Sequence, residues 1–304
     1  HCHLVSQIGQ PIASPQLVSV FASPREDGDL DRCKDEIRRI AAAELARIGG
    51  FAAELLDGGI ALDRWPLRRE TFYYAHRKGG PAVVPFDVRA ELEALLPTVV
   101  EADLGYLAQN QYEPGAAFRA ALARTDELIV KALPKGAAFL PREPVFSVTG
   151  PSGLVSWLEP LLLQWSYRLQ VATAALAHPE TLAEALGTAT CARQRELALS
   201  TLDAVGVKAP QIAVDSDGYG ARVEQRAREL AAIVGSGARI FEVGLRAATC
   251  VEQHLLALQA CQRAGVERTS NVWGAQQLGL VPVGTMGHEH VQRFGNDYAA
   301  FRAM

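Results

Sequence analysis

Residues 238–283 of the chain read ARIFEVGLRAATCVEQHLLALQACQRAGVERTSNVWGAQQLGLVPV, and this stretch decides the fold class. Its two ends, 238–243 and 278–283, are short and apolar, which is typical of buried strands. Between them we expect a helix over 247–262 and a shorter helix over 272–277. Strands that alternate with helices in this way predict parallel pairing, in a sheet or a barrel, and therefore an α/β protein.

Small polar residues and glycines follow the strands predicted in this stretch. Gly244-Leu245-Arg246 comes after the first strand, and Gly284-Thr285-Met286-Gly287-His288 comes after the last. Thr269-Ser270-Asn271 lies between them, at the start of the shorter helix. Ligands of parallel α/β folds gather at the carboxyl ends of the strands, so we expect a ligand site at these segments.

Arg246 is a candidate for anion binding, because a guanidinium at the start of a helix can hold a phosphate or a carboxylate through two hydrogen bonds. It could equally be a surface arginine or an ion-pair partner of Glu242. Thr269, Ser270 and Asn271 could hold a phosphate or a ribose, although helix capping alone explains at least one of them.

His288 follows the last predicted strand, and its neutral, nucleophilic form is abundant at neutral pH. It could accept a phosphoryl group, act as a base or bind a metal. We expect no zinc pair with His290, which would point elsewhere if the segment were a strand. Thr285 and Gly287 make a compact loop whose backbone N–H groups could approach an anion closely.

Composition excludes several classes of function for this chain of 304 residues. The net charge is −4 and there is no basic run, which argues against nucleic acid as the main partner. The five cysteines form no Cys-x-x-Cys motif, which favours a reduced, cytoplasmic setting. The longest apolar run, Trp157 to Trp165, contains Glu159 and is too short to span a bilayer.

We predict three parts along the chain: a β-β-α unit over residues 1–62, an α/β sandwich domain with a long helix over 63–180, and a helical insert with a partial α/β barrel over 181–304. Within them the patterns predict several further elements. These are helices over 67–77, 116–133, 153–177, 180–206 and 220–235, a strand over 82–88, and a pair of strands over 136–148.

About residues 63–304 resemble the nicotinate phosphoribosyltransferase family. The order and spacing of the motifs carry this resemblance more than any one of them. They are PVFSVTGP at 144–151, WLEPLLLQ at 157–164, FEVGLRA at 241–247, TSN at 269–271 and GTMGH at 284–288.

The resemblance implies a type II phosphoribosyltransferase fold, an open α/β sandwich packed on an irregular α/β barrel, that works as a homodimer. It implies that nicotinate and phosphoribosyl pyrophosphate form nicotinate mononucleotide and pyrophosphate, with Mg²⁺ on the pyrophosphate and ATP as a co-substrate. His288 matches the histidine that ATP phosphorylates in the family. Arg246, Thr269, Ser270, Asn271 and Thr285 match residues that line the substrate site.

The chain departs from the family pattern in several places, and two of these bear most on the site. The motif whose tyrosine stacks on the pyridine ring should fall near residues 63–74, where Tyr73, Tyr74 or Trp65 could take its place. The family also continues through further barrel strands, so we expect the chain to be a C-terminally truncated or fused product. The alternatives are therefore an incomplete relative that binds ligand without turnover, and an enzyme that acts on nicotinamide or quinolinate.

Residues 1–62 carry a different resemblance, to the C-terminal end of archaeal-type methionine adenosyltransferases. It rests on LVSQIGQPI at 4–12, PQLVSV at 15–20 and the helix that follows. Such a tail lacks the nucleotide and metal ligands of that enzyme, so we expect it to have no activity alone.

Overall fold

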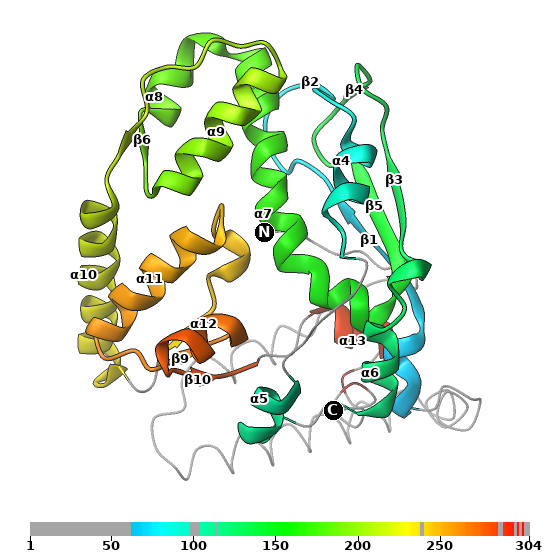
Figure 1. The fold of residues 1–304 in the computed structure, drawn as a ribbon, viewed down its shortest axis with the longest axis vertical. Helices are drawn as coiled ribbons and strands as arrows, with labels where there is room; N and C mark the ends of the chain where they lie inside the picture. The colour runs from blue at the N-terminus through cyan, green and yellow to red at the C-terminus, as the bar shows by residue number, and fades with distance from the viewer. Residues whose placement is uncertain are drawn as a thin grey trace.

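The computed structural model describes residues 62–97, 104–112, 115–237, 240–284, 288–294, 297 and 300. It is a mixed α/β protein, as the sequence predicts, with antiparallel and parallel sheets on opposite sides of one long helix (Figure 1). The β-β-α unit predicted for residues 1–62 lies outside the described residues, apart from the start of the first helical turn.

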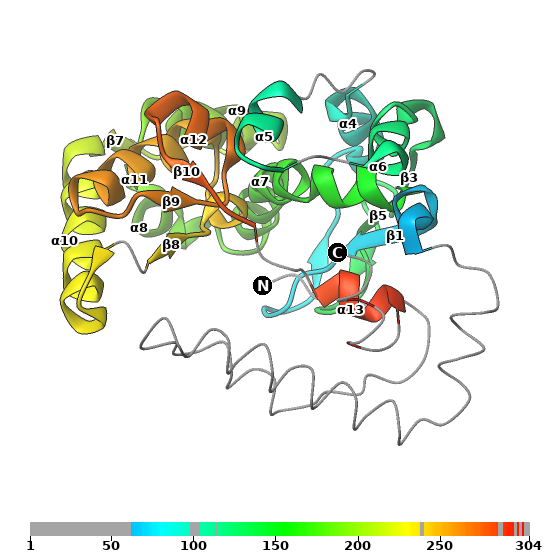
Figure 2. The same cartoon turned by 90° about the horizontal axis from the view of Figure 1, so that it is seen from below.

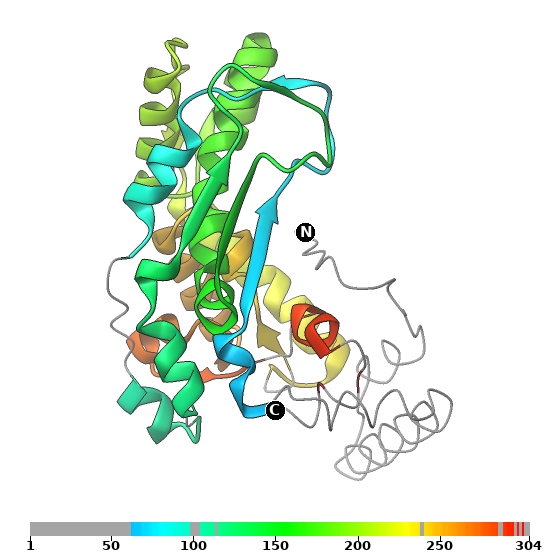
Figure 3. The same ribbon diagram turned by 90° about the vertical axis from the view of Figure 1, so that its right-hand side faces the viewer.

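The antiparallel sheet has the strand order β1-β5-β3, formed by β1 (Arg69–Tyr74), β5 (Phe146–Pro151) and β3 (Ile129–Ala132). The register places Phe72 opposite Val148 and Ile129 opposite Thr149. Every second residue of β5 is buried, because one face of the sheet packs on the helix behind it (Figure 3).

That helix is α7 (Ser152–Ala177), which confirms the long helix predicted over 153–177. It begins where β5 ends and runs between the two halves of the molecule (Figure 1). Its buried side chains join those of the antiparallel sheet in the largest core of the described residues. Gly153 lets the helix start close to its neighbours, because a Cβ there would lie 3.1 Å from both Phe118 and Pro66.

The other half contains the parallel strands, to the left in Figure 2. β8 (Phe241–Glu242), β9 (Arg268–Thr269) and β10 (Val281–Pro282) form a sheet in the order β10-β9-β8. η5 (Leu245–Ala247), α11 (Val251–Arg263) and α12 (Val272–Leu278) connect them. The strand–helix–strand prediction for residues 238–283 is therefore confirmed.

A second parallel pair precedes this sheet. β6 (Thr188–Ala189) pairs with β7 (Ala213–Val214), and α9 (Ala192–Ala204) links them. α10 (Ser216–Val234) then leads to β8 and packs along α11. The helix expected over 220–235 is present as α10, but β6 divides the one expected over 180–206 into α8 (Leu182–Leu186) and α9, and β7 lies between the two predicted helices. The sequence pattern indicated neither strand.

The last described helix, α13 (His288–Phe294), lies beside the antiparallel sheet rather than the parallel one (Figure 3). The Arg293 guanidinium binds the Glu70 carboxylate of β1 at 2.5 Å and 2.9 Å. Arg293 also lies over the ring of Trp65, with its Cζ 4.4 Å from the ring centroid. These contacts fix α13 to the N-terminal side of the described chain.

The remaining elements are short. They are η1 (Leu62–Leu67), β2 (Ala82–Val83), α4 (Val88–Leu95), α5 (Leu104–Gln109), α6 (Ala116–Leu122), η2 (Thr125–Glu127), β4 (Ala138–Phe139) and η3 (Pro179–Thr181). Most lie beside the antiparallel sheet or at the top of α7 in Figure 1, whereas α5 lies below the parallel strands. β2 pairs with β4, and Asp87 caps α4 by accepting a hydrogen bond from the Ala90 N–H at 3.0 Å.

Three of the predicted elements are wrong. The segment predicted as a helix over 67–77 contains β1 instead, because residues 69–74 pair with β5 far along the chain. The helix predicted over 116–133 ends at Leu122, since residues 129–132 join the same sheet as β3. The strand predicted over 82–88 ends after Val83, and α4 starts at Val88.

Candidate functional site

The carboxyl ends of β8, β9 and β10 lie at one edge of the parallel sheet, as the sequence analysis predicts. The Ser270 N–H donates to the Glu242 carbonyl at 2.9 Å, and the Val283 N–H donates to the Thr269 carbonyl at 2.9 Å. These bonds continue the ladder past the ends of the strands. They bring residues 244–246, 269–271 and Gly284 to the same edge.

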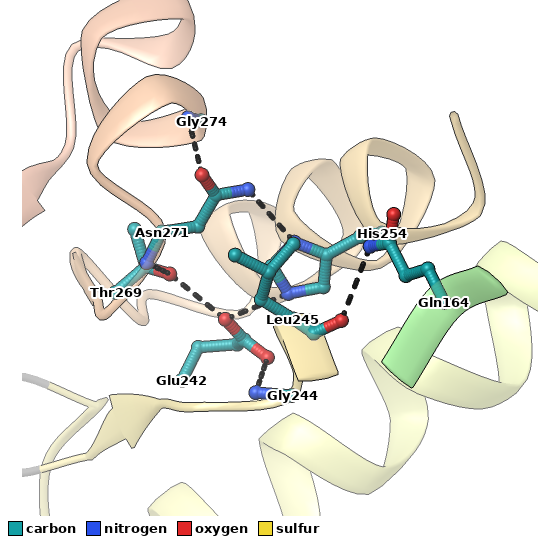
Figure 4. Close-up of polar contacts among 8 residues, drawn as sticks. All are labelled: Gln164, Glu242, Gly244, Leu245, His254, Thr269, Asn271 and Gly274. Carbon is teal, nitrogen blue, oxygen red and sulfur yellow. Dashed lines mark hydrogen bonds and ion pairs between the residues drawn. The ribbon is translucent and has the colours of Figure 1, made fainter. Parts of the chain in front are cut away.

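The Glu242 carboxylate contacts several of the segments at this edge (Figure 4). Its Oε2 accepts a hydrogen bond from the Thr269 hydroxyl at 2.8 Å and lies 3.0 Å from His254 Nε2. Its Oε1 accepts from the Gly244 N–H at 2.5 Å. One carboxylate thus joins β8, β9, α11 and the turn that leads to Arg246.

Asn271 sets the orientation of the His254 ring. It is the N-cap of α12, and its Oδ1 accepts from the Gly274 N–H at 2.9 Å. The Nδ2 group must therefore face His254 Nδ1, 2.9 Å away, and donate to it. A ring that accepts at Nδ1 carries its proton on Nε2, which is the atom that faces the Glu242 carboxylate.

The network stabilises the charged form of Glu242. Burial opposes ionisation, but the hydrogen bonds from His254, Thr269 and Gly244 outweigh it and hold the pKa of Glu242 below its usual value. His254 is only 2% exposed, its Nδ1 is bound by Asn271, and its Nε2 lies 3.0 Å from the Glu242 carboxylate. We conclude that His254 positions its neighbours and is not placed to exchange protons with a ligand.

The predicted substrate residues of the Thr-Ser-Asn segment have two different environments. Thr269 and Asn271 are 0% and 4% exposed, and their side chains bind Glu242, His254 and the start of α12. Capping, the simpler alternative for this segment, is therefore correct for Asn271. Ser270 is half-buried. Direct contact of these three residues with a substrate stays a prediction.

Arg246 lies in η5 on the solvent side of the network, with its side chain 55% exposed. Its Nη1 is 3.4 Å from Oε1 of Glu159 on α7, so its ion-pair partner is Glu159 and not Glu242. The Gln164 amide of α7 donates to the Leu245 carbonyl at 3.3 Å (Figure 4). The long helix therefore holds the turn that carries Arg246.

Glu159 also connects Arg246 with the tyrosines of β1. A small cavity of about 30 Å³ lies between β1, β5 and α7. Glu159, Tyr73 and Tyr74 line it, together with Phe72, Phe146, Leu162 and Leu163. Two of the predicted functional residues, Tyr73 and Arg246, are thus brought near each other by an acidic residue that the sequence analysis did not assign to the site.

The candidates for ring stacking differ in what their rings already contact. Tyr74 is 7% exposed and stacks on Phe146, with ring centroids 5.2 Å apart and planes inclined by 10°. The ring of Trp65 lies under Arg293 and is edge-on to His290. Tyr73 is half-buried on the opposite face of β1. Tyr73 is therefore the candidate whose geometry suits a ligand best.

Part of the predicted histidine loop, Thr285 to Gly287, lies outside the described residues, and so does the side chain of His288. The backbone of His288 begins α13, so the histidine predicted to follow the last strand in a loop lies at the start of a helix. The His290 ring is buried, with Nε2 2.9 Å from the Ala300 carbonyl and Nδ1 3.2 Å from Arg293. The catalytic role of His288 stays a prediction, as does that of Thr285 in binding.

A larger cavity of about 400 Å³ lies between α10, α11 and β8. Glu242 forms part of its wall, and Tyr219, Arg222 and Arg226 of α10 are its other polar lining residues. The remaining lining residues are apolar apart from Cys261. Glu242 therefore lies between the network and this cavity.

Two acidic residues and one histidine of the site were missing from the predicted set. Glu159 and Glu242 each interrupt an apolar run, and a charge at such a position is a signal for a buried partner. His254 gives no comparable signal, because its role depends on Asn271 and Glu242, which approach it only in the folded chain.

No group of three or more histidine, cysteine, aspartate or glutamate residues in the described part of the chain could hold a metal ion. Among the helices that the structure describes, none is long and apolar enough to cross a membrane.

Comparison with known proteins gives two kinds of similarity. A family model for S-adenosylmethionine synthetase matches residues 1–59, the segment that resembles methionine adenosyltransferases by sequence. Among curated proteins, none matches the chain.

Two solved structures are similar to the larger part. Human nicotinic acid phosphoribosyltransferase is 25% identical over 78% of this chain and 40% of its own, with a TM-score of 0.27. A Saccharomyces cerevisiae protein assigned as a nicotinate phosphoribosyltransferase is 15% identical over 79% of this chain and 52% of its own, with a TM-score of 0.43. The chain thus spans about half or less of the length of these structures.

Proposed function

We propose that this protein is a nicotinate phosphoribosyltransferase, which joins nicotinate to the ribose of phosphoribosyl pyrophosphate and releases pyrophosphate. The observation that carries the proposal is the convergence of motifs at one sheet edge. Residues 241–247, 269–271 and Gly284 are far apart in the sequence but meet at the ends of three parallel strands. These are three of the segments whose order resembles that family.

Arg246 is the cation that this site offers to an anionic substrate. Both substrates carry negative charge, and a guanidinium binds carboxylates and phosphates through paired hydrogen bonds. Its present partner, Glu159, is 3.4 Å away and both side chains reach solvent, so an anion can replace the carboxylate at low cost. Glu159 would then compete with the substrate and keep the guanidinium in place while the site is empty.

Displacement at the ribose carbon builds positive charge on the sugar and negative charge on the leaving pyrophosphate. The protein mainly has to position the reactants and neutralise charge. The Glu242 network suits this task, because it fixes the turn of Gly244 and hence the position of Arg246. Thr269 and Asn271 contribute through Glu242 and His254. Tyr73 would place its ring against the pyridine.

ATP coupling through a phosphohistidine at His288 is part of the same proposal. The helix that begins at His288 is fixed to β1 by Arg293 and Glu70, which gives the reacting histidine a rigid base. Mg²⁺ would enter with the pyrophosphate oxygens of the substrate. No step is assigned to the metal, because the described residues offer no group of ligands for it. A cytoplasmic location and a homodimer stay expectations.

A paired measurement of binding and turnover tests the proposal. The protein is mixed with nicotinate, phosphoribosyl pyrophosphate, Mg²⁺ and ATP, and nicotinate mononucleotide is measured beside the affinity for each substrate. Product formation that falls in His288→Ala supports both the reaction and the coupling. Binding without product indicates an incomplete relative, and product from nicotinamide but not from nicotinate changes the substrate.

A further inference from the structure

The chain contains two copies of a short motif that is not among the motifs that carry the phosphoribosyltransferase resemblance. Ala-Thr-Cys-x-x-Gln occurs at residues 189–194 and again at 248–253. At the same distances each copy continues with Leu-Ala-Leu and then Gly-Val. Leu-Ala-Leu lies at 197–199 in the first copy and at 256–258 in the second. Gly-Val lies at 206–207 and at 265–266.

The two copies fold alike around their first helix. Cys191 is the N-cap of α9, and Cys250 is the N-cap of α11. In the first copy, Gln194 Oε1 accepts from the Thr190 N–H and hydroxyl, both at 2.7 Å. In the second copy, the same atom of Gln253 accepts from the Thr249 N–H at 2.7 Å and its hydroxyl at 2.8 Å. In each copy the threonine before the cysteine is thus hydrogen-bonded to the glutamine after it. We call this bonded pair the threonine–glutamine clamp.

The two copies also match after this helix, as far as the start of the next helix. After its helix, each copy turns at a glycine with a left-handed backbone, Gly206 with φ +69° and Gly265 with φ +84°. A short strand parallel to the preceding one follows, β7 in the first copy and β9 in the second. Asp215 and Asn271 then cap the next helix by accepting from a glycine N–H three residues on. The two units are therefore structural repeats.

The repeats meet at their cysteines. The Sγ atoms of Cys191 and Cys250 are 3.6 Å apart, and the residues are 5% and 6% exposed. Both sulfurs are free thiols, and each lies at the first turn of a helix in a fixed position. Two thiols in contact, each held by its own clamp, have a high effective concentration for reaction with each other.

We propose that Cys191 and Cys250 form an intramolecular disulfide when the protein meets a small peroxide, and that this bond joins the two repeats. One thiol gives up its proton, and the thiolate attacks a peroxide oxygen, which breaks the O–O bond and gives a sulfenic acid. The hydroxide that leaves hydrogen peroxide takes up that proton and departs as water. The second thiol attacks that sulfur and releases another water. The two sulfurs are oxidised by two electrons in total, and the peroxide is reduced by two.

The geometry allows the bond with a small movement. A disulfide has a sulfur–sulfur distance of about 2.0 Å, so the first turns of α9 and α11 must approach by about 1.6 Å. Because both thiols are buried, only small oxidants can reach them. Burial also raises the pKa of the Cys250 thiol to about 12, with further contributions from the neighbouring Cys191 and Glu252. The reaction is therefore slow, and the dithiol is the form present without an oxidant.

Peptide mapping tests the proposal directly. Trypsin leaves Cys191 in the peptide 169–193, but it leaves Cys250 and Cys261 together in the peptide 247–263. The experiment therefore uses the full chain with Cys261→Ser, which keeps the pair and removes the ambiguity. The protein is treated with hydrogen peroxide, its remaining thiols are alkylated under denaturing conditions, and the digest is analysed by mass spectrometry without and with reductant.

We expect a linked pair of the peptides 169–193 and 247–263 that reductant separates, and none in Cys191→Ser or Cys250→Ser. The oxidised sample should also unfold at a higher temperature than the reduced one, because the link closes a long loop. Overoxidised single cysteines at either position without the linked pair would overturn the proposal, as would a link from either one to Cys2 or Cys33. Neither result would bear on phosphoribosyl transfer.

Discussion

Asn271 is the residue at which a helix cap and a buried hydrogen-bond network meet. One amide group caps α12 through Oδ1 and orients His254 through Nδ2. His254 in turn faces the Glu242 carboxylate, which fixes the turn of Gly244. The sequence predicts Asn271 as a substrate contact. In the structure its side chain holds other residues in place, so Asn271 affects the site through His254 and Glu242.

Replacing Asn271 by alanine should cost more than the loss of a cap alone. A lost N-cap costs about 1 kcal/mol, and a buried ring nitrogen left without a partner costs about 1–3 kcal/mol. We expect the free energy of unfolding of Asn271→Ala to fall by about 2–4 kcal/mol in urea titrations. The control is Asp87→Ala, which removes an exposed cap of α4 only and should cost about 1 kcal/mol. Equal losses in both variants would show that His254 does not depend on Asn271.

Glu242 should make the stability of the protein depend on pH. Its pKa is lowered in the folded state, so its contribution is fully present above the unfolded value of about 4.5 and is lost as the pH falls through the folded value. The difference in unfolding free energy between the wild type and Glu242→Gln should therefore shrink as the pH drops below about 4.5. The other carboxylates are the same in both proteins, so their contribution to the pH dependence cancels in this difference. A difference that does not change with pH would show that the carboxylate is not stabilised by its partners.

At the scale of elements, α13 depends on one ion pair. Arg293 is 1% and Glu70 17% exposed, and removing one partner of a buried pair costs about 3–5 kcal/mol. Arg293→Met should destabilise the protein by about that amount in urea titrations, and adding Glu70→Gln should recover part of the loss. A double variant that loses the sum of the two single effects would mean that the two side chains do not act as a pair.

Local patterns were sufficient for some elements and not for others. The α7 helix could be predicted because its apolar residues continue for many turns, and α12 because it has a cap and a glycine after its end. The Arg69–Tyr74 segment was predicted as a helix, although Phe72 and Tyr74 alternate with exposed residues as in a strand. Its partner, β5, lies more than 70 residues away, and no local pattern carries that pairing.

The residues of the candidate site also fall into those that local patterns predict and those that they do not. Arg246 could be found because it follows an apolar strand, where parallel folds expose ligand-binding groups, and Ser270 and Asn271 because they precede a predicted helix. Glu159, His254 and the choice of Tyr73 over Tyr74 required the tertiary structure. Each depends on a contact between segments that are separate in sequence, such as the 3.4 Å approach of Glu159 to Arg246.

At the scale of the whole molecule, α7 links the antiparallel sheet to the turn that carries Arg246. Tyr73 lines the cavity beside α7, and the Glu242 network fixes the turn that α7 holds, so the proposed substrate site lies between the antiparallel and the parallel sheet. We propose that this junction performs phosphoribosyl transfer to nicotinate, with Arg246 as the anion-binding cation.

Formation of nicotinate mononucleotide by the wild type, Arg246→Ala and Arg193→Ala tests this claim most directly. Arg193 is a matched control, since it is 51% exposed and forms a similar ion pair with Glu196 on α9. We predict product from the wild type and from Arg193→Ala, and a loss in kcat/KM of at least about tenfold in Arg246→Ala at unchanged stability, the effect of one lost charge-assisted contact. Equal activity of all three proteins, or no binding of either substrate by the wild type, would contradict the account.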